Sequence, residues 1–119
     1  MPRKFLQSLR HALRGVRTAA REERNFKIRL LIAVVILIAT FILHFSAIEF
    51  ALIVLAIALV LGTELLNTVI EDALDVVEPN HHPIIGKAKD VMAGVVLINA
   101  CAALLIGIAT VVHHMGFTR

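Results

Sequence analysis

The sequence of 119 residues contains no tryptophan, no tyrosine and only one cysteine. Tryptophan and tyrosine often anchor membrane proteins at the bilayer interface, so phenylalanine alone remains for that role here. The single cysteine, Cys101, excludes an intrachain disulfide. The chain also lacks a Walker A sequence, a glycine-rich fingerprint, a His-Glu-x-x-His motif and a Ser-His-Asp arrangement. Any nucleotide chemistry would therefore need a site of another kind.

Charged side chains are missing from three long stretches. Residues 30–48, 50–63 and 91–118 carry no Asp, Glu, Lys or Arg, and 59% of the whole chain is hydrophobic. Because roughly 20 apolar residues cross a bilayer as a helix, these stretches predict membrane spans. The predicted fold is an all-α single membrane domain over residues 1–119, with transmembrane helices at about 29–46, 49–70 and 92–113.

The N-terminal segment is basic and amphipathic. Nine of the twelve basic residues lie between Arg3 and Arg29, and apolar side chains recur there at helical spacing with cations on the opposite face. The pattern predicts a surface helix over residues 1–26, in the headgroup plane. Two roles stay open: an anchor or fence around a lipid substrate, or a topology determinant alone. A cleavable targeting peptide is disfavoured, because both the basic region and the first apolar run are too long.

The distribution of basic residues predicts the orientation. Cytoplasmic loops are enriched in Lys and Arg, which places the N-terminus in the cytoplasm and makes residues 76–90 a cytoplasmic loop. Eleven of the twelve basic residues then lie inside. Two pairs of adjacent histidines are predicted to be solvated loop residues rather than metal ligands, His81 with His82 and His113 with His114.

A stripe of polar residues follows the second span. Offsets of 3, 7, 11 and 14 residues from Glu64 stay within one sector of a helix, and these positions hold Asn67, Glu71, Asp75 and Glu78. A solvated helix end explains Asp75 and Glu78. Glu64 and Asn67 lie inside the apolar run, where acids are expensive, so a functional role is favoured for these two.

Clustered carboxylates suit a hard cation such as Mg²⁺, and lysine beside such a cluster suits a phosphate. A second acidic pair, Glu22 and Glu23, precedes the first span, although it could be a plain surface charge pair. Lys87, Lys89 and Asp90 lie across the predicted loop, although such a run also begins many solvated helices. From these residues alone the protein is a membrane enzyme or a cation pathway.

Several of these motifs resemble the sequence pattern of a known protein family. The order and spacing of Glu64, Asn67, Thr68, Glu71 and Asp75 closely resemble the Glu-x-x-Asn-Ser/Thr-x-x-Glu-x-x-x-Asp pattern of the small prokaryotic diacylglycerol kinase family. The run from Gly86 to Leu97 and the segment from Glu22 to Phe26 resemble two further blocks of that family. The resemblance covers nearly the whole chain.

The resemblance implies a homotrimer in the bacterial cytoplasmic membrane, with composite sites where MgATP phosphorylates a lipid hydroxyl and no nucleic acid takes part. By matched position, Glu64 is the implied general base and Asn67 its neighbour. Glu23 and Glu71 are the implied Mg²⁺ ligands, Lys89 the contact to the ATP phosphates, and Asp90 a residue that shapes the nucleotide site.

One position departs from the diacylglycerol-using branch, where an acid is expected and this chain has Arg29. Asn67 with Thr68, His82 with Pro83, and Lys89 with Asp90 look more like the undecaprenol kinase branch. The lipid, undecaprenol or diacylglycerol, therefore stays open. The rival interpretations are an intramembrane cation pathway and a non-catalytic helix-packing subunit, the latter because Asn99, Ala103 and Gly107 give the third span a small, polar face.

Overall fold

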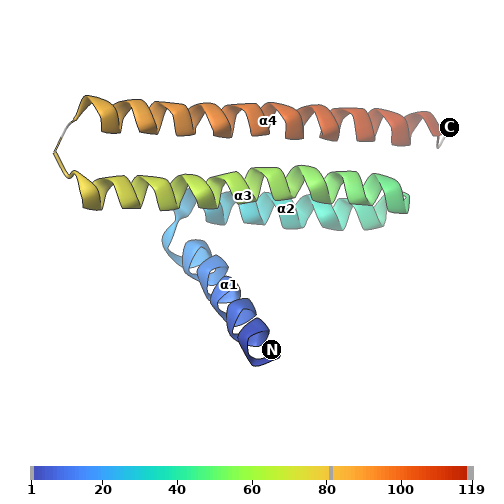
Figure 1. Cartoon of the computed structure of the whole chain (residues 1–119). Coiled ribbons are helices and arrows are strands. Elements are labelled where there is room, and N and C mark those ends of the chain that lie inside the picture. The colour runs from blue at the N-terminus through green and yellow to red at the C-terminus, as the bar shows by residue number, and fades with distance from the viewer. Residues whose placement is uncertain (1, 81, 118–119) are drawn as a thin grey trace.

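The computed structural model describes residues 2–80 and 82–117, which form helices and no strand (Figure 1). The helices are α1 (Pro2–Glu22), α2 (Arg24–Ile42), α3 (Ala47–Val77) and α4 (Pro83–Phe117). Helices α2, α3 and α4 are long and apolar enough to cross a membrane. The predicted architecture, a basic N-terminal helix followed by three apolar helices, is confirmed.

Helix α3 is the element against which the other two long helices pack. It lies antiparallel to α4 along its length and also packs against α2, while α1 leaves the group at an angle (Figure 1). Helix α1 packs against α2, and two residues near the connection between them are buried, Ala19 and Phe26. Phe26 is only 1% exposed, so it anchors the corner between the basic helix and the first span.

The surface of the three long helices is apolar. Large side chains such as Leu31, Leu97 and Leu105 are each more than 60% exposed. A water-soluble protein rarely exposes apolar surface so extensively, whereas hydrocarbon solvates it well. The helices also satisfy their own backbone hydrogen bonds, which a bilayer requires.

The connection between α3 and α4 is shorter than predicted. The prediction of a loop over residues 76–90 is wrong, because α3 continues to Val77 and α4 already begins at Pro83. Proline is well suited to a first helical turn, since its missing N–H would have no partner there. The backbone N–H of Ile84 donates to Nδ1 of His82 at 3.1 Å, which caps the new helix. His82 is exposed, as expected of a turn residue, and its neighbour His81 lies outside the described residues.

The turn between α2 and α3 begins earlier than the predicted spans imply. Helix α2 ends at Ile42, so the last four residues of the span predicted at 29–46 belong to the turn. His44 adopts a positive φ of 57°, which reverses the chain. Ser46 then caps α3: its Oγ accepts from the Glu49 N–H at 3.2 Å, and Oε1 of Glu49 accepts from the Ser46 N–H at 2.8 Å. This capping box fixes where α3 begins.

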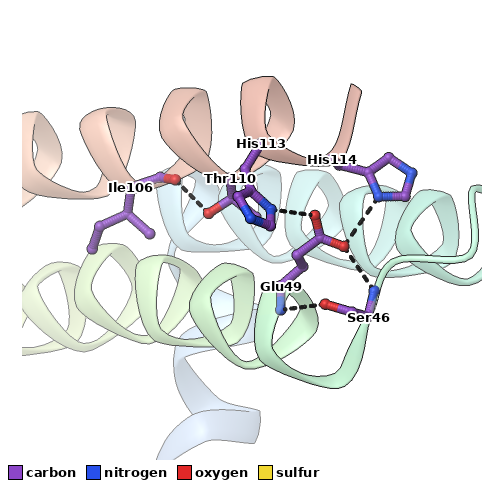
Figure 2. A network of polar contacts seen from close by, with 6 residues as sticks. All are labelled: Ser46, Glu49, Ile106, Thr110, His113 and His114. Atoms are coloured by element: carbon purple, nitrogen blue, oxygen red, sulfur yellow. Dashed lines mark hydrogen bonds and ion pairs between the residues drawn. The ribbon is translucent and has the colours of Figure 1, made fainter. Parts of the chain in front are cut away.

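Glu49 also joins α3 to the far end of α4 (Figure 2). Its Oε2 lies 3.1 Å from Nδ1 of His113, and its Oε1 lies 3.1 Å from Nδ1 of His114. The ring of His114 stacks on that of Phe45 at a centroid distance of 4.1 Å. The prediction of a loop at His113 and His114 is therefore wrong, although the side chain of His113 is exposed as predicted. Both belong to α4, and α3 presents a buried carboxylate to them.

We name Ser46, Glu49, His113 and His114 the terminal clasp. The Glu49 carboxylate, which is 7% exposed, accepts hydrogen bonds inside the clasp that water would otherwise supply. We expect Glu49→Gln to lower the free energy of unfolding by about 1–3 kcal/mol, because an amide replaces one acceptor oxygen and the charge is lost. Denaturant titration of the purified protein in detergent micelles, followed by circular dichroism, measures the change.

The matched control is Asp72→Asn, which removes the charge of an exposed carboxylate from the same helix. It should leave the unfolding free energy within about 0.5 kcal/mol of the parent protein, as surface substitutions usually do. Equal stability of the two variants would show that the clasp does not hold α3 and α4 together.

Candidate functional site

The polar stripe of α3 lies on one face of an unbroken helix and passes from buried to exposed. Glu64 is 6% exposed, Asn67 is half-buried, and Glu71 and Asp75 are exposed. The Nδ2 of Asn67 lies 3.5 Å from Oε1 of Glu71, which agrees with a shared face. The stripe therefore runs from an apolar interior to the solvated end of α3, residues 71–77, which we name the acidic end.

Glu64 has a partner that the sequence analysis did not assign. The Arg29 side chain reaches from α2 and places Nη1 at 2.9 Å from Oε2 of Glu64. The side chain of Glu64 is 8% exposed and that of Arg29 is 35% exposed, so the carboxylate is the buried member of the pair. A buried carboxylate without a cation would be strongly destabilising, and Arg29 provides that cation.

The surrounding hydroxyls are bonded within α3. Thr63 donates from Oγ1 to the Leu59 carbonyl at 2.6 Å, and Thr68 donates to the Glu64 carbonyl at 3.1 Å. Each hydroxyl donates to a backbone carbonyl one turn earlier in the helix, which meets the need of a polar group in apolar surroundings for a hydrogen bond. The Glu64 carboxylate is not bonded by these hydroxyls and faces Arg29 across the interface between α2 and α3.

Lys89 and Asp75 connect α4 to the acidic end. The Nζ of Lys89 lies 2.9 Å from Oδ1 of Asp75; the Asp75 side chain is exposed and that of Lys89 is partly exposed. Asp90 follows on α4 and is exposed. The short α3–α4 connection thus brings the Gly86–Asp90 block beside the stripe, on a helix instead of the predicted loop.

Glu23 occupies the corner between α1 and α2. It is the N-cap residue of α2, half-buried, with extended backbone angles of φ −100° and ψ 109°, and its side chain makes no capping hydrogen bond. Within residues 2–80 and 82–117, no three His, Cys, Asp or Glu side chains converge to hold a metal ion. The pairing of Glu23 with Glu71 as metal ligands therefore stays a prediction.

An apolar groove of about 650 Å³ lies between α2, α3 and α4. Its walls include Ala33 from α2, Ile53 from α3 and Gly107 from α4. Arg29 is the one charged residue among the described residues that line it. The volume falls in the range of small-molecule sites, and the lining suits a hydrocarbon chain. The groove and the Glu64 carboxylate therefore meet at Arg29.

Arg29 is the site residue that sequence reasoning missed, although a signal existed. It lies near the start of the first span and Glu64 lies near the end of the second. Two consecutive spans run antiparallel, so these positions reach a similar depth. Opposite charges at one depth of a membrane tend to pair.

The comparisons with known proteins agree with these observations. A family model described as Prokaryotic diacylglycerol kinase matches residues 10–111. The undecaprenol kinase of Bacillus subtilis (strain 168) is 40% identical over 105 residues, which are 88% of this chain and 85% of that protein. A diacylglycerol kinase of Synechocystis is 40% identical over 104 residues, 87% of this chain but 59% of that protein. A diacylglycerol kinase of Haemophilus influenzae is 30% identical over 97 residues, 82% of each chain.

Proposed function

Because the chain belongs to the prokaryotic diacylglycerol kinase family, we propose that it is a MgATP-dependent lipid kinase that phosphorylates the primary hydroxyl of a membrane lipid. The observation that carries the proposal is the position of Glu64, a buried carboxylate that pairs with Arg29 of the apolar groove and begins a stripe of acids that leads to water. A lipid kinase must join a hydroxyl from the bilayer to a phosphate donor from solution. The arrangement of Glu64, the groove and the acidic end meets that need.

In the proposed reaction, Glu64 is the general base, and Asn67 lies one turn along the stripe. The carboxylate accepts the proton of the lipid hydroxyl while the hydroxyl oxygen bonds to the γ-phosphorus of ATP. The bond between that phosphorus and the β–γ bridging oxygen breaks, and ADP leaves. The apolar groove beside Arg29 accommodates the hydrocarbon chain of the lipid, which keeps its hydroxyl near Glu64.

The nucleotide is assigned to the acidic end. An ammonium group has three donors, so the bond from Lys89 to Asp75 leaves two for the ATP phosphates. Asp90 follows Lys89 on α4 and shapes the nucleotide site. Glu23 and Glu71 offer carboxylate oxygens, the ligand type that Mg²⁺ prefers, and would hold the ion. Held there, Mg²⁺ would supply positive charge beside the transferring phosphate.

The chain is an integral membrane protein, and we place it in the bacterial cytoplasmic membrane with its N-terminus in the cytoplasm. The acidic end then faces the cytoplasm, where ATP is available. We further propose a homotrimer with sites shared between copies. Asn99 supports association, because it is a polar, partly exposed side chain in the middle of the apolar α4, where another helix could bond it.

The first test of this function concerns the base. We expect Glu64→Gln to reduce kcat for ATP-dependent lipid phosphorylation by about 10²- to 10⁴-fold, because an amide cannot accept the proton. The KM for ATP should remain near that of the parent protein, since the nucleotide is held elsewhere. Transfer of labelled γ-phosphate to lipid in detergent micelles measures both values. Near-normal turnover would remove Glu64 from the mechanism, and no turnover in the parent protein would reject the function.

A second test concerns the metal. If Glu23 and Glu71 hold one Mg²⁺, either change to Gln should raise the Mg²⁺ concentration for half-maximal activity. The double variant should be little worse than the poorer single one, because groups that act as a unit are not additive. Multiplying effects would mean that the two carboxylates serve different sites.

The third test concerns the lipid. We expect activity on both undecaprenol and diacylglycerol, with undecaprenol preferred in kcat/KM, because Arg29 replaces the acid of the diacylglycerol branch. Both lipids present one primary hydroxyl, so apolar contacts must discriminate, at about 1–3 kcal/mol each. Competition of the two lipids in one mixed micelle, followed by quantification of each product, gives the ratio. An excess of phosphatidic acid would return the protein to the diacylglycerol branch.

A further inference from the structure

The ion pair between Arg29 and Glu64 connects two helices that are consecutive in the chain. The 2.9 Å contact joins Nη1 of Arg29 in α2 to Oε2 of Glu64 in α3. A guanidinium presents a planar fork of five donors, so it orients a carboxylate as well as neutralising it. With its side chain 8% exposed, Glu64 has little access to water that could take over either task.

Arg29 also contacts the space from which an apolar ligand would arrive. It is the one charged residue among the described residues that line the groove between α2, α3 and α4. Arg29 lines the groove and its Nη1 pairs with the Glu64 carboxylate, so this one side chain connects the groove to Glu64. The position is therefore different from that of a salt bridge that only fastens two helices.

We propose that Arg29 is a positioning residue for the Glu64 carboxylate and fixes the orientation in which Glu64 faces a lipid hydroxyl at the end of the groove. The inference rests on the function proposed above and adds a residue to it. Arg29 acts through Glu64 and has no bond to the substrate in this reaction. Its removal should therefore impair the chemical step and leave the binding of both substrates intact.

The primary test is Arg29→Met, which keeps much of the apolar stem and removes the fork. We expect kcat to fall about tenfold to a hundredfold, as for partners that orient a reactive group, with the KM values for ATP and for undecaprenol within about twofold of the parent protein. Arg29→Lys keeps the charge and should recover most of the lost kcat. A raised KM for either substrate with kcat unchanged would overturn the proposal, because Arg29 would then be a binding residue.

The matched control is Arg21→Met, which removes an exposed arginine at the end of α1. It should keep the activity of the parent protein. If the Met variant fails to fold in detergent, the pair Arg29→Lys and Arg29→Gln replaces it. The Lys variant should then exceed the Gln variant by at least about fivefold in kcat, since only Lys keeps the positive charge that strengthens a hydrogen bond to the carboxylate. Equal values would overturn the proposal.

A double-variant experiment distinguishes positioning from an independent effect. Glu64→Asp shortens the carboxylate side chain by one methylene, which should weaken its 2.9 Å contact with Arg29. In that background, Arg29→Met should lower kcat by less than about threefold, because residues that act through one another are not additive. A full tenfold or larger further loss would show that Arg29 acts apart from Glu64.

Failure of this inference is distinguishable from failure of the proposed function. If the parent protein phosphorylates lipid and Glu64→Gln abolishes it while Arg29→Met is fully active, only the role of Arg29 is rejected. If the parent protein transfers no phosphate to lipid, the function itself is rejected, and the role of Arg29 with it.

Discussion

Helix α3 must keep two carboxylates, Glu49 and Glu64, among apolar side chains, and most of the tertiary arrangement follows from that constraint. Taking a carboxylate out of water costs several kcal/mol unless a partner is well placed. Each of the two acids finds its partner on a different neighbouring helix. Arg29 of α2 pairs with Glu64, and two histidines of α4 bond Glu49. The two acids thereby connect α3 to both of its neighbours.

The two buried acids differ in what surrounds them. Glu49 accepts hydrogen bonds from the Ser46 backbone and contacts His113 and His114, so its oxygens are engaged inside the terminal clasp. Glu64 pairs across helices with Arg29, and Arg29 in turn lines the apolar groove. A carboxylate with remaining acceptor capacity could accept a proton in the proposed reaction, whereas a fully engaged one stabilises the fold. The physical difference between the two acids agrees with the proposed roles, a stabilising one for Glu49 and a chemical one for Glu64.

The stripe from Glu64 to Asp75 changes from buried to exposed within one continuous helix. Its beginning adjoins hydrocarbon-lined space and its end is exposed beside the Lys89 ammonium. A reaction between a lipid and a water-soluble phosphate donor has to cross the same boundary. One helix therefore provides a path of polar groups from the apolar interior to water. Its backbone hydrogen bonds stay intact along the path, as the interior of a bilayer requires.

Some elements were predictable because their signals are local. The charge-free stretches predicted three apolar helices, and the spacing of Glu64, Asn67 and Glu71 predicted a shared face, since side-chain direction follows from helical periodicity alone. The predicted loop over residues 76–90 is too long, because α3 and α4 both continue beyond their apolar stretches into charged segments. Pro83 instead begins a helix, which places Lys89 and Asp90 on a rigid element. The clasp had a local signal too, since Ser46 and Glu49 have the spacing of a capping box.

The sequence by itself determined the helices, their order, their apolar and polar faces and the family to which the chain is similar. It did not determine which charges meet across helices. The contact of Arg29 with Glu64, and those of His113 and His114 with Glu49, are seen only in the tertiary structure. The periodicity of a helix sets where a side chain points relative to its own axis, but the rotation and register of one helix against another depend on packing between their surfaces. Partners 35 and 64 residues apart in the chain are therefore decided by that packing.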